Sequence, residues 1–321
     1  MNATTGSQRP PLSLIIAAFA AVYLIWGSTY LVIRYAIDSL PPFLMAGSRF
    51  FFAGVILFAW AMRGQTAWPT RREWRDATIV GTLLLLGGNG GVTWAEQTIP
   101  SSIAALMVAM TPLWMALLGW RSGAGRPTRP VLIGLALGFA GVALLVLNGK
   151  GYDGQALDRV GLAVLLIATI AWAGGSLFSR SAAKPKSALL TIGMQMITGG
   201  AVMTLVGVGF GETRQIDPGA ITASSLWAWL YLMTFGALVG FTAYVWLLQV
   251  CSPSKVSTYA FVNPVIAVAL GCTLGKEPFS LRLVFATTLI VIAVLLIIRG
   301  GPPRPRTAGP AASLLTAEKP T

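Results

Sequence analysis

Histidine is absent from the sequence, and aspartate and glutamate together account for only ten of its 321 residues. Protein metal sites rely on histidine, cysteine and carboxylate ligands, and a serine or cysteine nucleophile usually needs a histidine base. The chain has two cysteines and no acidic residue well inside an apolar segment. We therefore expect no metal site, no cofactor and no enzymatic activity.

Charge of either sign is also scarce, at 10% of the chain against about 25% in soluble domains. Hydrophobic residues make up 55% of the sequence, and apolar runs recur roughly every 30 residues. Each run is long enough to cross about 30 Å of hydrocarbon as a helix. This composition predicts an all-α membrane protein, with membrane lipid as its surroundings.

The net charge of +13 would suggest nucleic-acid binding in a soluble chain. Here the basic residues fall in short segments between apolar runs, without a contiguous basic cluster that carries exposed aromatics. We therefore expect no nucleic acid as a partner. A small-molecule substrate is the expected partner, and a monomer is one oligomeric state that the sequence allows.

Ten apolar segments are predicted to span the membrane. Residues 1–11 precede them as a polar N-terminus, and residues 301–321 follow as a tail with five prolines, which predicts disorder. The predicted spans are Leu12–Ile33, Phe43–Met62, Ala77–Thr93, Ser101–Leu118, Val131–Leu147, Val160–Phe178, Ala188–Phe210, Leu226–Leu248, Val256–Leu274 and Leu281–Ile298.

The orientation follows from lysine and arginine, which are enriched in cytoplasmic loops. With the N-terminus inside, 16 basic residues fall in inside segments and 6 in outside segments, and Arg49 lies within a span. Both termini are therefore predicted to be cytoplasmic. The first span is too long for a cleaved signal peptide, so the sequence predicts a multi-pass protein of the bacterial inner membrane.

An internal repeat divides the spans into two halves, residues 12–149 and residues 150–300. Identical residues recur at a constant offset of 152 positions. An odd number of spans in each half means that the two copies are inverted relative to each other. Inverted repeats place a substrate site near the midplane, where rocking of the halves can give alternating access. The matched pairs are Trp94 and Trp246, Gln97 and Gln249, Ser102 and Ser254, Pro112 and Pro264, and Gly119 and Gly271.

Arg49 lies about seven residues into the second predicted span. A guanidinium at that depth must reach the interface, pair with another side chain or face water. A structural ion pair with Glu96 is one interpretation, since Glu96 follows the third span on the same side. The other interpretation is a substrate site in which Arg49 binds a carboxylate through two hydrogen bonds.

Two prolines, Pro112 and Pro264, fall at matching places within the fourth and ninth spans. Each proline removes a backbone hydrogen bond and frees a carbonyl one turn earlier. Those carbonyls need partners in hydrocarbon. Thr111 and Asn263 can satisfy them, or the kinks can act as hinges that line a cavity, in which case both side chains are candidate substrate ligands.

Five further polar or aromatic positions complete the candidate substrate site. Asn89 lies among glycines in the middle of the third span, where its amide either bonds to another helix or lines a wet cavity. Four deep aromatic residues can form pocket walls that suit amphiphilic metabolites, or they can simply pack between helices. These four are Trp26, Trp172, Tyr244 and Tyr259.

The sequence resembles the EamA family of the drug/metabolite transporter superfamily over about residues 12 to 300. The resemblance rests on Trp26-Gly-Ser-Thr-Tyr30, on Arg49-Phe50, on the proline-centred fourth and ninth spans, and on Gly275-Lys-Glu-Pro278. Within that family the sequence looks similar to bacterial exporters of amino acids and related metabolites. This similarity implies ten spans, cytoplasmic termini and broad specificity.

One departure from the family pattern concerns an acidic residue that commonly follows the fourth span. Glu277 holds this place after the ninth span, but the matching position in the first half is Gly125. A role for that first-half carboxylate therefore does not carry over to this chain.

These features together predict an exporter of amino acids, aromatic ones included, and related metabolites. Proton-driven carriers usually bury acidic residues or histidines along the path, so the sequence favours transport without a dedicated proton relay. The alternatives are a drug, sugar or nucleotide-sugar carrier of the same superfamily and an intramembrane enzyme. A nucleotide-sugar carrier would need several basic groups in its cavity, and an enzyme would need a polar catalytic cluster.

Overall fold

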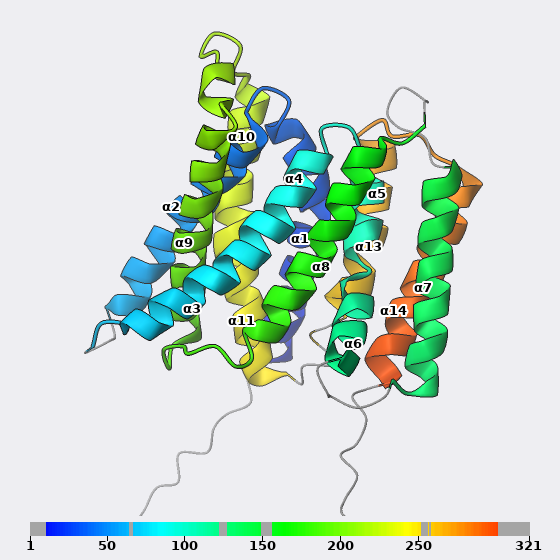
Figure 1. Cartoon of the computed structure of the whole chain (residues 1–321), viewed down its shortest axis with the longest axis horizontal. Helices are drawn as coiled ribbons and strands as arrows, with labels where there is room; N and C mark the ends of the chain where they lie inside the picture. Colours follow the sequence, from blue (N-terminus) through cyan, green and yellow to red (C-terminus); the bar gives the residue numbers. More distant parts are fainter. Residues whose placement is uncertain are drawn as a thin grey trace, which may run out of the picture.

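The protein is a bundle of long helices in the computed structural model, which describes residues 11–63, 67–121, 127–148, 156–251, 256 and 258–300. No β-strand occurs in these ranges, and most helices run along one common direction (Figure 1). Seven helices of the described part are long and apolar enough to cross a membrane, and two shorter apolar helices accompany them. The all-helical membrane fold predicted from composition is thus confirmed, whereas the number of ten crossings stays a prediction.

The described part of the first half contains eight helical segments. The segments α3, η1 and α4 follow one another without a break, and η1 is a π-helix. The bounds are α1 Leu12–Ala36, α2 Pro42–Met62, α3 Arg71–Gly81, η1 Thr82–Gly90, α4 Gly91–Ala95, α5 Ser101–Val108, α6 Thr111–Arg121 and α7 Arg129–Asn148.

The second half also contains a continuous helix with a π-helical middle, made of α10, η3 and α11. A short 3-10 helix, η2, lies between α9 and α10. The bounds are α8 Arg159–Phe178, α9 Ala188–Gly209, η2 Glu212–Gln215, α10 Ala223–Tyr231, η3 Leu232–Val239, α11 Gly240–Val250, α13 Tyr259–Thr273 and α14 Leu281–Gly300.

The starts of some helices are set by local side-chain capping that hydropathy does not detect. The helix α3 begins six residues before the predicted span at Ala77, because Thr70 and Glu73 form a reciprocal capping box. The helix α8 begins after Asp158, whose carboxylate accepts hydrogen bonds from the amides of Gly161 and Val160 and from the hydroxyl of Thr98. These bonds hold the pKa of the Asp158 carboxyl below its usual value.

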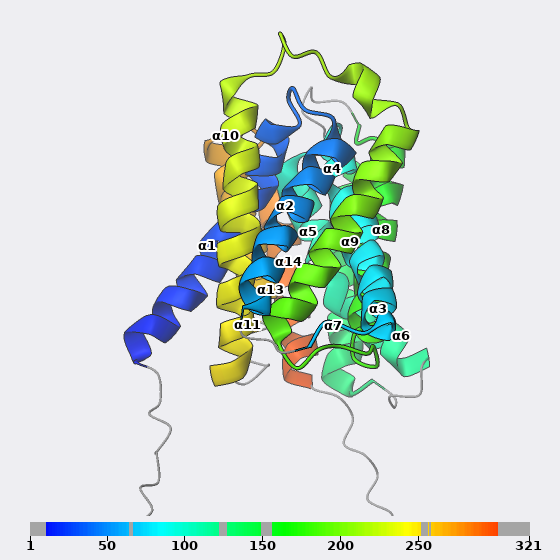
Figure 2. The same ribbon diagram turned by 90° about the vertical axis from the view of Figure 1, so that its left-hand side faces the viewer.

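Some predictions concern residues outside the described ranges. These are the disordered tail at 301–321, nearly all of the N-terminal segment, Gly125 and Ser254, together with the side chain of Gln249. At the described ends, α1 begins and α14 finishes at the same end of the bundle, which is the lower end in Figure 2. We call the opposite end, with residues 37–41, 96–100 and 211–222, the outer end, following the predicted orientation.

The main helix contacts join the two halves rather than closing each half on itself. The helix α2 packs along α9, and α7 packs along α14 (Figure 1). The helix α1 contacts α13, and α8 makes the matching contacts with α5 and α6. The continuous helix α10–η3–α11 packs on α1, as α3–η1–α4 packs on α8. Each contact thus has a counterpart in which the two halves exchange roles.

The contact between α2 and α9 is close because glycines face backbone across it. A methyl group added at Gly200 would lie 2.6 Å from the amide nitrogen of Phe51 and 2.8 Å from the carbonyl oxygen of Gly47. One added at Gly193 would lie 2.8 Å from the amide nitrogen of Phe58. Small residues let helix backbones approach in this way inside membranes.

Replacing Gly200 with alanine tests this contact. We expect Gly200→Ala to lower stability by about 1–3 kcal/mol, because backbone atoms cannot move aside as a flexible side chain can. The apparent melting temperature of the purified protein in detergent measures the effect.

The matched control is Gly174→Ala in α8, where an added methyl group would meet nothing within 4 Å. This substitution should be neutral or slightly stabilising, since alanine favours helix over glycine. Equal melting temperatures for the two variants would contradict the proposed tight contact between α2 and α9.

Candidate functional site

Arg49 on α2 is buried, with 3% of its surface exposed. Its Nη2 donates a hydrogen bond of 3.1 Å to Oδ1 of Asn89, and its guanidinium lies 4.5 Å from the ring centre of Phe50. Its Nε has no hydrogen-bond partner. The structural ion pair considered from the sequence is not formed, since no Arg49 nitrogen lies within 4.0 Å of a Glu96 oxygen. The partner of Arg49 in this structure is Asn89.

Asn89 belongs to the π-helical segment η1, and the second half carries η3 at a comparable place in its own third helix. A π-helix widens the turn and leaves backbone groups in unusual positions, and such segments are frequent at functional sites. In η3 the carbonyl of Gly236 accepts a hydrogen bond of 3.1 Å from Nε1 of Trp26. The segment η1 thus contains the predicted site residue Asn89, and η3 binds the predicted site residue Trp26 through a backbone carbonyl.

Three of the four deep aromatic residues form one cluster. The ring centre of Trp26 lies 5.2 Å from that of Tyr244 and 5.3 Å from that of Tyr259. Phe241 completes the cluster, with its ring centre 5.2 Å from that of Trp26. The helices α1, α11 and α13 thus converge on Trp26, and the tilted and edge-to-face arrangements are those that aromatic pairs prefer.

Trp172, the fourth deep aromatic, lies apart from this cluster against the first half. A methyl group at Gly88 would lie 2.6 Å from its ring, so the glycines of η1 make room for it. Trp172 and Phe241 line a small cavity of about 40 Å³ between the halves, together with Gly81, Leu84, Leu85, Ile192, Gln195 and Met196. A volume of that size holds a few water molecules, so an amino acid requires the cavity to widen.

The two proline regions differ in detail. Pro112 follows a break at residues 109–110, where α5 ends and α6 begins. The hydroxyl of Thr111 donates a hydrogen bond of 2.7 Å to the carbonyl of Val108, so this freed carbonyl has a partner. The helix α13 instead continues through Pro264. The neighbouring Asn263 is buried at 7% exposure, and its Oδ1 has no hydrogen-bond partner.

Two buried carboxylates at the outer end bind helix N-termini across the two halves. Glu277 accepts hydrogen bonds from the amide of Ser101 at 2.7 Å, from its hydroxyl at 2.6 Å and from the amide of Ser102 at 3.0 Å. Glu212 accepts from the amides of Phe43 and Leu44 at 3.2 and 2.8 Å. The first turns of α5 and α2 are thereby capped by the second half.

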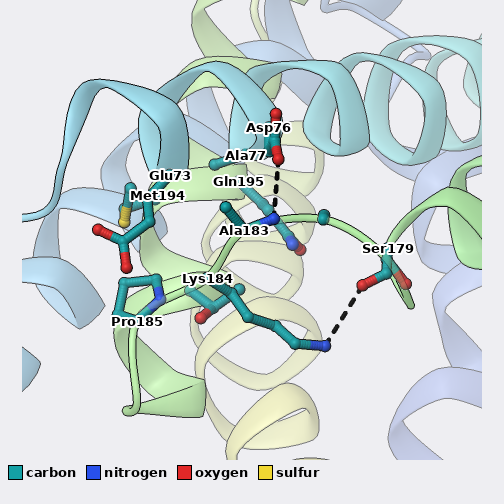
Figure 3. A pocket seen from close by; sticks show the side chains of 11 residues that line it. Glu73, Asp76, Ala77, Ser179, Ala183, Lys184, Pro185, Met194 and Gln195 are labelled. Atoms are coloured by element: carbon teal, nitrogen blue, oxygen red, sulfur yellow. Dashed lines mark hydrogen bonds between the residues drawn. The ribbon is translucent and has the colours of Figure 1, made fainter.

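A third carboxylate crosses between the halves at the opposite end of the bundle. Asp76 on α3 accepts a hydrogen bond of 2.7 Å from the amide of Ala183, in the segment between α8 and α9 (Figure 3). Its other oxygen pairs with Arg75 at 2.8 Å. Lys184 donates to the carbonyl of Ser179 beside a pocket of only about 10 Å³. This contact fixes a connecting segment and offers little room for a ligand.

Sequence reasoning missed the π segments and the capping carboxylates. Glu277 carried a signal in Gly275-Lys-Glu-Pro278, but its partners Ser101 and Ser102 lie far away in the sequence. Glu212 had no local signal, because its partners precede it by about 170 residues. The π segments fall within ordinary apolar runs, where periodicity does not reveal them.

The fold and the buried polar groups together indicate a class of protein. A multi-pass helical bundle that holds a buried arginine, an asparagine and a small aromatic-lined cavity between two halves is built as a membrane transporter. The described residues contain no group of three or more metal-binding side chains.

The family model described as the EamA-like transporter family matches the chain twice, over residues 12–147 and 159–299. The chain therefore belongs to the EamA-like transporter family, as the resemblance of its motifs implied. The two matched ranges together cover most of the chain.

Relatives of similar length agree with this assignment. Uncharacterized inner membrane transporter YedA of Escherichia coli (strain K12) is 37% identical over 288 residues, which covers 89% of this chain and 91% of that protein. Uncharacterized transporter YvbV of Bacillus subtilis (strain 168) is 23% identical over 290 residues, covering 90% and 93%. The protein is thus a multi-pass transporter of the inner membrane.

A solved structure titled "Crystal structure of protein" shares the fold. It superposes with a TM-score of 0.60 at 21% sequence identity, and the match covers 89% of this chain and 96% of that chain. The similarity in fold therefore extends over most of the chain.

Replacing Glu277 with glutamine tests the capping of α5 from the second half. We expect Glu277→Gln to lower stability by about 1.5–3 kcal/mol, because hydrogen bonds to a charged acceptor are lost and an amide donor faces backbone N–H groups. The apparent melting temperature in detergent is the measurement.

The control is the same substitution at Glu96, which is also fully buried but has no hydrogen-bond partner on either oxygen. Glu96→Gln removes no bond and should leave the melting temperature equal or higher. A drop at Glu96 as large as that at Glu277 would show that burial, and not helix capping, determines the effect.

Proposed function

We propose that this transporter exports amino acids, aromatic ones included, and related small metabolites by alternating access. The observation that carries the proposal is Arg49, a cation buried in the membrane interior with only Asn89 as a hydrogen-bond partner. Its Nε is unpaired. A guanidinium with spare donors suits the carboxylate shared by all amino acids.

The aromatic residues support the amphiphilic nature of the substrate. Trp172 borders the cavity between the halves, and Trp26, Tyr244 and Tyr259 cluster beside Phe241, which lines the same cavity. Aromatic walls offer large apolar area with few rotatable bonds, and they stack well on apolar or aromatic side chains. We propose that the binding site is completed when the cavity widens. Its further residues are then Trp26, Trp172, Tyr244, Tyr259, Thr111 and Asn263.

The contacts between helices support the inverted five-helix repeats that the sequence predicts. The pairs α2–α9 and α7–α14, and the matched contacts of α1 and α8, have the exchange symmetry expected of inverted repeats. We propose that Pro112, at the break between α5 and α6, and Pro264, within α13, serve as hinges or kinks. An unpaired Oδ1 on Asn263 next to Pro264 is consistent with a residue that faces a cavity in another state.

The energy source proposed here is the gradient of the substrate or the membrane potential. The buried acids of the described part lie near helix ends, at residues 76, 96, 212 and 277, and three of them bind backbone amides. A chain of acidic residues across the bundle, as a dedicated proton relay requires, is not built by these positions.

The alternative of a nucleotide-sugar carrier is less well supported. Such a substrate carries several phosphate charges and needs several basic groups. Among the described residues, Arg49 is the one buried basic side chain.

Transport by the purified protein in proteoliposomes tests the proposal. We expect uptake of labelled amino acids, phenylalanine and tryptophan among them, with equal pH on both sides. Uptake of a drug or a nucleoside in the absence of any amino-acid transport would contradict the substrate class, and a strict requirement for a pH gradient would contradict the energy source.

Substituting Arg49 tests its role in binding the carboxylate. We expect Arg49→Met to reduce transport at least tenfold, because a charge-assisted hydrogen bond is worth about 1.5–3 kcal/mol. Arg49→Lys should keep part of the activity. The exposed Arg214 provides the control, since Arg214→Met removes the same charge without touching the site. Normal transport by a folded Arg49→Met protein would exclude Arg49 from substrate binding.

A further inference from the structure

Four acidic side chains are buried within the described residues, and they fall into two kinds. Asp76, Glu212 and Glu277 accept hydrogen bonds from backbone amides of the other half. Glu96 is the exception, with 0% exposure and no hydrogen-bond partner on either carboxylate oxygen. A buried acid without partners is costly, so it calls for a role that helix capping does not explain.

Glu96 stands at the end of a polar row on one helix. It follows α4 directly, and Thr93 lies three residues before it on the same face. Thr93 is also fully buried, and its hydroxyl oxygen has no partner. Asn89 precedes Thr93 by four residues and binds Arg49. The row thus leads from the Arg49–Asn89 pair to the outer end.

The basic side chain of Arg49 and the acidic side chain of Glu96, at the end of this row, form no direct ion pair. Arg49 and Glu96 interact electrostatically, but no nitrogen of Arg49 lies within 4.0 Å of a Glu96 oxygen. The other titratable groups whose charges act with Glu96 are Tyr30 and Arg34 on α1 and Glu277 before α14. Glu277 is already bound to the N-terminus of α5.

We propose that Glu96 binds the ammonium group of an amino acid whose carboxylate is held by Arg49. This inference rests on the proposed function and adds Glu96, with Thr93, to the substrate site. An ammonium group donates three hydrogen bonds and suits the free oxygens of both side chains.

The lack of a direct ion pair leaves Nε of Arg49 and both oxygens of Glu96 available to the two ends of a zwitterion. Each charge-assisted hydrogen bond to the substrate takes up about 2.8 Å, so a ligand that joins the two groups needs them more than one bond length apart. Such a ligand would bind the oxygens of Glu96 and Nε of Arg49. None of these atoms has a hydrogen-bond partner in this structure. The site is closed in this structure, and in an exporter the opening of the outer end releases the substrate.

Arg49 and Glu96 make a chemical distinction that the aromatic residues near the cavity do not. An amine without a carboxylate should depend on Glu96 alone, and an N-acylated amino acid should depend on Arg49 alone. Aromatic stacking, in contrast, is the same for all three compounds because their side chain is unchanged.

The test is a cycle that combines a protein variant with a ligand change. Inhibition of labelled phenylalanine transport is measured for phenylalanine, N-acetylphenylalanine and phenylalaninamide, with wild-type protein and with Glu96→Gln. In the wild type, acetylation should weaken inhibition by about 10- to 100-fold, as expected for a lost bond to a charged group. In Glu96→Gln the same acetylation should weaken inhibition by less than about threefold, which is well below the loss expected for a hydrogen bond to a charged group.

Two further arms complete the cycle. Phenylalaninamide should lose affinity in Glu96→Gln but little in Arg49→Gln, and N-acetylphenylalanine should show the reverse. Asp217 is exposed at the outer end, so Asp217→Asn controls for the loss of one negative charge and should leave all three inhibition constants unchanged. Melting temperatures confirm that each variant folds.

The outcomes separate this inference from the proposed function. If the wild type carries no amino acid, the proposed function fails. If it carries amino acids but acetylation costs the same in wild type and in Glu96→Gln, Glu96 does not bind the ammonium group. A third outcome is that acetylation costs the same in both proteins and that Glu96→Gln also abolishes a pH dependence of transport. Glu96 would then bind a proton, which overturns the inference.

Discussion

Carboxylates that bind helix N-termini across the two halves hold the outer end of this transporter together. The first amides of a helix have no partner within the helix, and in hydrocarbon they have no water either. Glu212 supplies acceptors to α2, and Glu277 supplies them to α5. Each carboxylate also places its negative charge at the positive end of a helix dipole. A single acidic residue at these positions therefore stabilises both the backbone of a helix start and the contact between the two halves.

The position of Arg49 depends on this arrangement. Glu212 holds the start of α2, and the glycine contact with α9 holds the rest of the helix in place. The Arg49 guanidinium therefore lies at a defined depth, within hydrogen-bond distance of Asn89. The helix α9 also packs on η1, which carries Asn89. Both partners of the hydrogen bond are therefore placed by the same helix of the second half, and a buried charge is kept in a region where solvation is lacking.

Much of the all-helical fold was predictable from the sequence, because long apolar runs indicate which segments form long apolar helices. The start of α3 at Arg71 was not, since it depends on the capping box of Thr70 and Glu73. The deep aromatic residues were identified by type and depth, but the contact of Trp26 with Tyr244 and Tyr259 joins positions more than 200 residues apart. For Arg49, the sequence offered Glu96 as a partner, and the widened turn of η1 brings Asn89 into hydrogen-bond reach instead. Such choices depend on helix packing, which periodicity does not encode.

The backbone contact between α2 and α9 also limits which parts of the molecule can behave as rigid bodies. With Gly47 and Gly200 facing each other, separating the helices would expose bare backbone and would lose the packing that small residues provide in lipid. The contact between α7 and α14 likewise joins the two repeats. Any rearrangement that preserves these two contacts must carry helices of both repeats together. The units of such a rearrangement are composite bundles, and their boundaries differ from the boundary between the repeats in the sequence.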